Sequence, residues 1–211
     1  LMRNFYEENV AAVISTTKAN NTYSFLEKLQ RFDYIFAAYG RSLMSRINTL
    51  HVTPGVLSVY RTNIIKKLGY FDAENITEDL EIAMRLRYHG YNIKMESSSI
   101  TLTQVPSKLK PFWKQRVRWY RGLLFNSARY KKMFMNKKYG TMGVFQYPVT
   151  ILTVLIIYAL FFVSSYEILT SLYEFILRVV LVKSGIFYIF DNMDIKSALL
   201  SLDIRLWFPL S

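Results

Sequence analysis

The chain has 211 residues, of which 52% are hydrophobic, and it carries a formal net charge of +12 with a slightly positive mean hydropathy. It has no cysteine and only two histidines, which excludes disulfides, zinc–thiolate sites, thiol nucleophiles and a histidine-based metal cluster. The hydrophobic content is high for a soluble domain and low for a protein made only of membrane helices. We therefore expect a water-soluble part joined to a membrane part.

The first 50 residues follow the pattern of an α/β fold. An initial helix precedes residues 11–15, which are small and uniformly apolar, as in a strand buried inside a sheet. A polar break at 18–22 then leads into a long amphipathic helix. Its apolar side chains recur at helical spacing, at Phe25, Leu29, Phe32 and Phe36.

The next segment predicts a turn and a second strand. Residues 51–61 contain the dipeptide Pro54-Gly55, which is typical of a turn, followed by residues suited to a strand. A short helix that ends near Gly69 comes next.

A clearer helix begins after Thr77. This residue can act as an N-cap, and Glu78 and Asp79 lie in the first turn, where the helix dipole favours negative charge. Gly90 is expected to end this helix, and residues 91–95 predict another strand.

A long basic segment follows, with Pro106 and Pro111 bracketing a linker and Pro111 opening a helix over 112–130. Residues 97–166 contain no acid. Such a segment favours an anionic neighbour, which can be nucleic acid, lipid headgroups or a phosphorylated substrate, and its position beside an apolar run favours the last two. The basic residues are Lys108, Lys110, Lys114, Arg116, Arg118, Arg121, Arg129, Lys131, Lys132, Lys137 and Lys138.

The apolar run predicts a membrane segment. No residue from 139 to 166 is charged, and a bilayer core needs about 20 residues. We predict a transmembrane helix at about 142–163, with the basic side in the cytoplasm. A second apolar helix at about 168–190 contains Glu174 and Arg178, four residues apart, and is either a second span or an interfacial helix.

The sequence Thr77-Glu78-Asp79 is the first candidate for chemistry. A carboxylate at a loop-to-helix junction is held ionised and oriented by backbone donors, which suits a general base. Taken alone, the same three residues are also explained by simple capping of the helix.

The second candidate is the Q-x-x-R-W pattern at 115–119. Positions i, i+3 and i+4 share one helix face, so Gln115, Arg118 and Trp119 point the same way, and Gly122, at i+7, leaves that face open to close approach. Arginine binds pyrophosphate, an amide binds hydroxyls, and an indole ring can lie against a sugar. The alternative is a basic helix that Trp119 anchors at a membrane interface.

In combination, T-E-D, Q-x-x-R-W about 35 residues later, a basic stretch and a membrane span resemble the processive family 2 glycosyltransferases. That family includes cellulose synthase, hyaluronan synthase and poly-N-acetylglucosamine synthase. Three further segments are similar to the family and occur in the same order: Pro54-Gly55 with Tyr60-Arg61, Gly69-Tyr70-Phe71-Asp72, and Gly90-Tyr91-Asn92-Ile93. The resemblance covers roughly residues 1–140.

The resemblance implies a role for each matching residue. Asp79 matches the catalytic base, and Glu78 and Thr77 match its flanking motif positions. Arg118 matches the residue near the donor pyrophosphate, Trp119 the one beneath the acceptor sugar, and Gln115 belongs to the same motif. Pro54 and Gly55 match the acceptor side.

The resemblance also implies an organisation. Residues 1–110 would be the C-terminal part of a GT-A catalytic domain, 111–140 a basic interfacial region, and 141–211 a membrane region. The protein would be a multi-pass protein of the cell membrane, with its catalytic part in the cytoplasm.

One family element, the D-x-D motif that holds Mg²⁺ or Mn²⁺ with the nucleotide diphosphate, has no match in this sequence. The nearest pattern, Asp191-Asn-Met-Asp194, has the wrong spacing. Because the sequence starts at Leu1 and stops at Ser211 within an apolar stretch, we expect a fragment that lacks the metal ligands and is inactive alone, although the intact protein is an enzyme.

The resulting hypothesis is an inverting enzyme that transfers a sugar from a nucleotide sugar to a growing polysaccharide. The donor is expected to be UDP-linked, and membrane lipids are expected to surround the protein. One alternative is a single-addition glycosyltransferase acting on a lipid acceptor, with a glycolipid as its product. The other is a non-catalytic, membrane-anchored basic protein.

No nucleic-acid partner is expected, because no helix-turn-helix or aromatic-interleaved surface is visible. His51 and His89 are interpreted as ordinary loop and helix residues.

Overall fold

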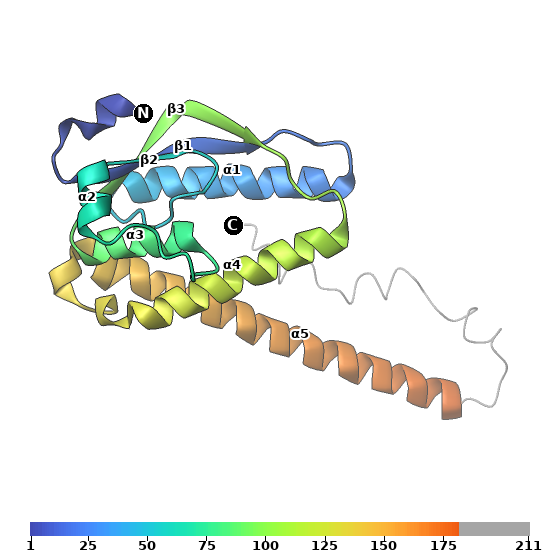
Figure 1. Cartoon of the computed structure of the whole chain (residues 1–211). Helices are drawn as coiled ribbons and strands as arrows, with labels where there is room; N and C mark the ends of the chain where they lie inside the picture. The colour runs from blue at the N-terminus through green and yellow to red at the C-terminus, as the bar shows by residue number, and fades with distance from the viewer. Residues whose placement is uncertain (182–211) are drawn as a thin grey trace. The chain divides into compact units, whose positions relative to one another are not determined.

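The computed structural model describes residues 1–181, and the chain divides into two compact units, Leu1–Thr153 and Val154–Ser211. The first unit contains a three-stranded sheet with helices packed against it (Figure 1). The strands are β1 (Val10–Ala19), β2 (Ser58–Tyr60) and β3 (Asn92–Thr103). The α-helices are α1 (Phe25–Arg46), α2 (Thr62–Lys67), α3 (Glu78–Tyr88), α4 (Leu109–Arg129) and α5 (Tyr147–Leu181). Short 3-10 or π turns are η1 (Met2–Tyr6), η2 (Lys131–Met133), η3 (Lys137–Tyr139) and η4 (Met142–Gln146).

Strand β1 lies in the middle of the sheet, antiparallel to β2 and parallel to β3. Its first five residues, 10–14, are fully buried, which explains why they are all small and apolar. The predicted α/β class is therefore confirmed. The parallel pair requires a crossover, and the chain makes it through α1, β2, α2 and α3.

Both long strands extend further than the sequence predicts. The expected polar break at 18–22 begins inside β1, because Lys18 still pairs with Leu102 of β3. The strand predicted at 91–95 likewise continues to Thr103. Polar side chains are compatible with pairing here because the ladder uses backbone groups, and the side chain of Lys18 is exposed.

Helix α3 is fixed by two apolar clusters, one on each side. Ile82, Ala83 and Leu86 pack into the cluster that includes β1 and α2. Leu80 and Met84 pack into a second cluster, together with Tyr130, Met133, Met142 and Tyr147. Because α3 is held on both sides, the residues at its two ends have defined positions.

Helix α1 forms where its periodicity predicts, and it begins with a capping box between Ser24 and Glu27. Its apolar stripe, however, faces outward: Phe25 is 83% exposed and Phe36 is 71% exposed. The residues of α1 that are buried are polar, namely Glu27, Gln30 and Ser45. The apolar spacing therefore identified the helix but not the face that packs on the sheet.

Helix α4 begins at Leu109, so Pro111 lies in its first turn rather than at its first position. A proline is tolerated there because the first amides of a helix have no partner within it.

Helix α5 differs from the prediction of two separate helices at about 142–163 and 168–190. It runs without interruption to Leu181, through the predicted break at 164–167. That segment contains no Pro or Gly, and the Ser165 hydroxyl donates to the Phe161 carbonyl within the helix. Residues 182–190, and the pair Asp191 and Asp194, lie outside the described residues.

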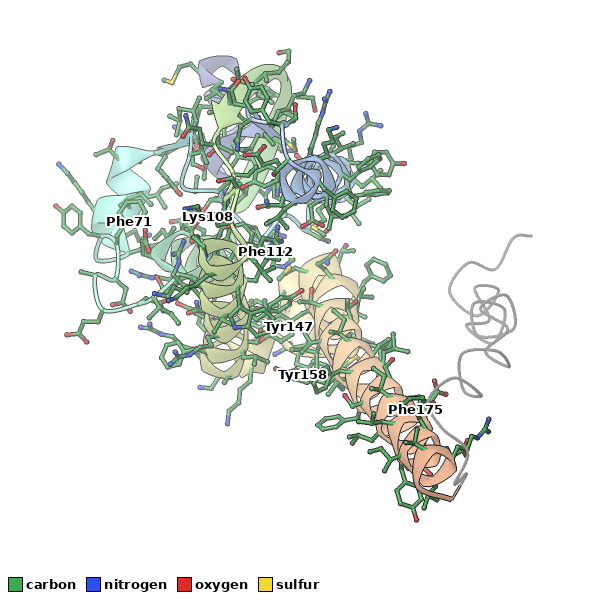
Figure 2. The ribbon with its side chains drawn as sticks, turned by 90° about the vertical axis from the view of Figure 1, so that its right-hand side faces the viewer. Phe71, Lys108, Phe112, Tyr147, Tyr158 and Phe175 are labelled. Carbon is green, nitrogen blue, oxygen red and sulfur yellow. The ribbon has the colours of Figure 1, made fainter. Side chains whose placement is uncertain are left out.

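The helix over Met142–Val179 is long and apolar enough to cross a membrane. Only 6% of its most apolar window is buried, and side chains such as those of Tyr158 and Phe175 project from α5 in Figure 2. Glu174 and Arg178 form the predicted ion pair, with 3.6 Å between their charged atoms.

Candidate active site

The carboxylate of Asp79 lies where the loop before β2 meets the start of α3. The amide of Leu80 donates to Oδ1 at 2.8 Å, and the amide of Gly55 donates to Oδ2 at 3.2 Å. The Thr53 hydroxyl donates to the Asp79 carbonyl oxygen at 2.6 Å. The carboxylate is therefore oriented by two backbone donors, one from each segment.

The environment of Asp79 makes it a stronger base than an ordinary aspartate. Burial is the main influence and raises the pKa of its carboxyl, and the nearby Glu78 raises it further. The amides of Leu80 and Gly55, and the charge of Arg118, lower the pKa and oppose this effect. A raised pKa makes the carboxylate a better proton acceptor.

Thr77 occupies the N-cap position of α3, as predicted, but its side chain does not cap the helix. Instead, the Asn126 side-chain amide of α4 donates to the Thr77 hydroxyl oxygen at 3.1 Å. Asn126 also pairs with Asn75: the Asn75 amide donates to Asn126 Oδ1 at 2.8 Å. All three residues are buried, so these bonds connect the start of α3 to α4.

Gly122 allows α4 to approach this junction closely. A Cβ atom at Gly122 would lie 2.1 Å from the Thr77 hydroxyl oxygen and 2.7 Å from Thr77 Cβ. The glycine of the Q-x-x-R-W face is thus required for helix packing. The sequence predicts a close approach at Gly122, and it is Thr77, at the start of α3, that makes it.

Arg118 extends from α4 toward the same junction. Its guanidinium donates to the Ile76 carbonyl oxygen at 3.2 Å, and its charge acts on Asp79. Its side chain is exposed, so the remaining guanidinium donors can reach a ligand.

The other two predicted residues of this helix face are in different surroundings. The Arg116 guanidinium lies over the Trp119 ring, 4.8 Å from its centroid, and forms an ion pair with Asp33 of α1 at 2.7 Å. The Gln115 Oε1 atom is buried without a hydrogen-bond partner. Among residues 1–181, neither Trp119 nor Gln115 forms a hydrogen bond or an ion pair with Asp79, whereas the charge of Arg118 acts on the carboxylate.

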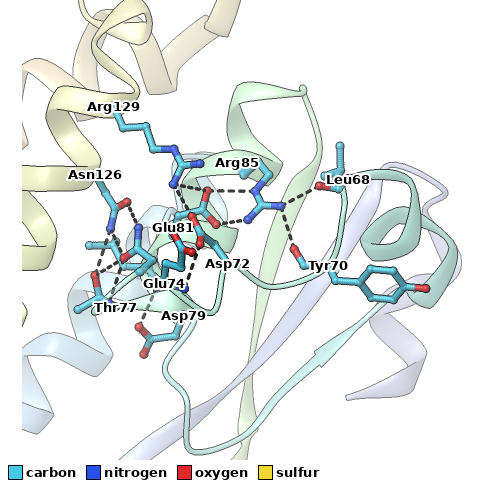
Figure 3. A network of polar contacts seen from close by, with 12 residues as sticks. Leu68, Tyr70, Asp72, Glu74, Thr77, Asp79, Glu81, Arg85, Asn126 and Arg129 are labelled. Atoms are coloured by element: carbon cyan, nitrogen blue, oxygen red, sulfur yellow. Dashed lines mark hydrogen bonds and ion pairs between the residues drawn. The ribbon is translucent and has the colours of Figure 1, made fainter.

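A buried ionic cluster surrounds Glu81, two residues after Asp79 in α3. The Glu81 carboxylate accepts hydrogen bonds from Arg85 and from the Tyr130 hydroxyl, and Arg129 lies 3.8 Å away. Arg129 also pairs with Asp72 at 2.6 Å (Figure 3). Burial and the Glu81 carboxylate raise the pKa of Tyr130 well above its usual value, which keeps the phenol protonated as a donor.

Comparison with known protein families matches residues 1–190 to the family described as "Glycosyl transferase family group 2". The chain belongs to this glycosyltransferase family. A poly-beta-1,6-N-acetyl-D-glucosamine synthase of Staphylococcus aureus (strain COL) is 32% identical over 127 residues, which cover 58% of this chain and 30% of the relative. The synthase of the same name from Staphylococcus epidermidis is 34% identical over 117 residues, covering 54% of the chain and 28% of the relative. The match thus spans less than a third of these relatives.

Two more of the predicted site residues, Glu78 and Pro54, lie next to residues already described. Glu78 is exposed, beside Asp79 in the first turn of α3. Pro54 precedes the glycine that donates to Asp79, and its carbonyl accepts a hydrogen bond from the Ser58 hydroxyl at 2.8 Å.

The sequence interpretation missed Asn75, Asn126 and the Glu81 cluster. Asn126 continues the face of Gln115, Trp119 and Gly122 by one more turn, so extending the same helical spacing would have identified it.

No metal site is visible in this part of the glycosyltransferase. Residues 1–181 contain no group of three or more His, Cys, Asp or Glu side chains that could hold a metal ion. The described residues therefore do not fit the Mg²⁺ or Mn²⁺ implied by the resemblance, and no chemical step below depends on a metal.

Two cavities of the described residues lie away from Asp79. One, of about 680 Å³, is at the C-terminal end of α3, and the other, of about 350 Å³, lies between the end of β1 and α1. Asp79 itself is partly exposed at its junction.

Proposed function

We propose that this chain belongs to an inverting glycosyltransferase that transfers a sugar from a nucleotide sugar to the hydroxyl of a growing polysaccharide. The observation that carries the proposal is the Asp79 carboxylate, oriented by two backbone amides and raised in pKa by burial, with Arg118 in electrostatic reach. A carboxylate with these properties suits a general base.

In the proposed reaction, Asp79 accepts the proton of the acceptor hydroxyl. The resulting oxygen nucleophile forms a bond to the anomeric carbon of the donor sugar as the bond to the nucleoside diphosphate breaks, and the configuration inverts. Arg118 stabilises negative charge on the leaving diphosphate through its free guanidinium donors. Trp119 and Gln115 are proposed to contact the acceptor sugar, and Pro54 and Gly55 to border it.

The relatives suggest the substrate class. Their name specifies a β-1,6-linked N-acetylglucosamine polymer, so a nucleotide-linked N-acetylglucosamine, with UDP as the carrier, is the first donor to test. Mg²⁺ or Mn²⁺ remains a proposed cofactor of the whole protein.

We also propose a multi-pass protein of the cell membrane with its catalytic part in the cytoplasm. One apolar helix of sufficient length and the outward apolar stripe of α1 support membrane association. The basic residues that precede the apolar helix support the cytoplasmic orientation.

The test is Asp79→Asn in the full-length protein, reconstituted in lipid and supplied with labelled UDP-N-acetylglucosamine. We expect sugar transfer to fall by roughly 10²–10⁴-fold, the usual contribution of a general base, while donor binding changes little. Glu74→Gln is the matched control, because Glu74 is exposed on the loop before α3 and also loses one negative charge.

Transfer that continues at the wild-type rate in Asp79→Asn would remove Asp79 from the role of base. The same assay tests the alternatives, because product length distinguishes them. A polymer supports processive synthesis, a glycolipid with one added sugar supports single addition, and no transfer by the wild-type protein supports the non-catalytic alternative.

A further inference from the structure

A groove at the C-terminal end of α3 has no role in the proposed reaction. It has a volume of about 680 Å³, within the usual range for ligand sites, and no predicted active-site residue lines it. Its walls come from the end of α3, from the segment after α1 and from the segment between α4 and α5. It is therefore a separate feature of the first unit.

The groove is lined by a buried charge without a carboxylate partner. Arg87 is 8% exposed, and no ion pair within the described part of the chain involves it. Its guanidinium donates to the carbonyl oxygens of Asn48 and Tyr91 and to Asn92 Oδ1, which are all neutral acceptors. The Arg87 Nε atom is buried without a partner.

Such an arrangement is costly for a protein. Hydrogen bonds to neutral oxygens compensate only part of the desolvation of a buried cation, and this burial lowers the pKa of Arg87 to about 10. An anion bound in the groove would provide the missing charge.

The other walls of the groove are also suited to an anion. Lys138 and the imidazole of His89 line it, and none of the lining residues is Asp or Glu. The rings of Tyr88 and Tyr139 are stacked, 5.4 Å apart, and provide an aromatic surface. At the helix end, the amides of residues 89–91 occupy the carbonyl oxygens of residues 85–87, which reduces the number of free carbonyls that would oppose an anion.

We propose that this groove is a binding site for a phosphate-bearing anion, held by Arg87 and Lys138, with a glycerol- or sugar-sized group against the two tyrosines. Two sources share this chemistry, an anionic phospholipid headgroup and a free phosphate ester. The lipid is favoured by the sequence, since Lys138 lies only four residues before the apolar helix that begins at Met142.

The test uses the full-length protein in an uncharged detergent and isothermal titration calorimetry. The probes are short-chain phosphatidylglycerol, short-chain phosphatidylcholine and glycerol 1-phosphate. The variant is Lys138→Gln and the control is Lys137→Gln, which removes the same charge from an adjacent exposed residue that does not line the groove. Melting temperatures are recorded for both variants, and we expect them to match the wild type because both lysines are exposed.

We expect Lys138→Gln to weaken binding of phosphatidylglycerol by roughly tenfold, the loss typical of one charge-assisted hydrogen bond, and Lys137→Gln to weaken it less than about twofold. Phosphatidylcholine should bind more weakly than phosphatidylglycerol. Binding of glycerol 1-phosphate as tight as that of the lipid would identify a soluble phosphate ester as the ligand.

The proposal is overturned if neither anion binds, or if both lysine variants weaken binding equally. Sugar transfer is not measured, so the outcome is independent of the role of Asp79.

Discussion

Glu81 and Arg87 are two buried charges on the same helix with opposite surroundings. The Glu81 side chain is fully buried, yet it has two arginines and a tyrosine hydroxyl around it. Arg87 is almost as buried, but its partners are neutral oxygens. Because an uncompensated buried charge is unfavourable, the paired charge is explained by the fold alone, whereas the unpaired charge suggests a ligand.

The paired charge should be the more damaging one to remove. Glu81→Gln leaves Arg85 and Arg129 without their shared carboxylate, and breaking a buried pair from one side costs roughly 3–5 kcal/mol. We expect a loss of this size in the free energy of unfolding of the full-length protein. Chemical denaturation followed by tryptophan fluorescence measures it, with Trp113 and Trp119 of α4 among the reporters.

Tyr130→Phe is the matched control for the cluster. It removes one neutral donor to Glu81 and leaves both arginines in place, so we expect a loss of about 1 kcal/mol. If Glu81→Gln were no more destabilising than Tyr130→Phe, the cluster would not stabilise α3 as an ionic unit, and the contrast with Arg87 would lose its meaning.

The packing of α4 against the start of α3 can be tested with two glycines. Gly122→Ala places a methyl group within 2.3 Å of two Thr77 side-chain atoms, and overpacking of this kind costs about 1–3 kcal/mol. Gly40→Ala, in α1, meets nothing within 4 Å and should stabilise the protein by up to about 1 kcal/mol. Thermal unfolding of both variants measures the difference.

Opposite signs for the two glycine variants are the expected result. Stabilisation by Gly122→Ala would show that α4 does not approach Thr77 closely, and it would remove the physical link between the two motifs.

Sequence patterns were informative where local chemistry decides the structure. The apolar run at 11–15 identified the central strand, and the acidic first turn identified the start of α3 together with Asp79. The spacing from Gln115 to Trp119 also identified one helix face. Each of these features depends on neighbouring residues only, so each can be read from the chain.

Sequence patterns failed where tertiary contacts decide. The bonds between Asn126 and Thr77 join residues 49 positions apart and exist only because α4 crosses the start of α3. The extension of β1 to Ala19 depends on pairing with β3, which the polar side chains conceal. The outward stripe of α1 shows the same limit, because helical periodicity does not reveal which face meets the sheet.

The smallest expected effect concerns the pH dependence of stability. Burial raises the pKa of Asp79 above 3.8, so its contribution to stability is present below about 3.8 and is lost as the pH rises through the folded pKa. Asp79→Asn does not titrate. We therefore expect the Tm of this variant, relative to wild type, to increase as the pH rises from below 3.8 and then to level off.

Asp72→Asn provides the control of opposite sign. The hydrogen bond from Arg129 lowers the pKa of Asp72, so this carboxylate contributes stability above its unfolded pKa and loses it as the pH falls through the folded value. The Tm of Asp72→Asn relative to wild type should therefore decrease as the pH rises over the same range. If both differences changed in the same direction, Asp79 would not be a desolvated carboxylate, and the physical reason for assigning it as the base would be lost.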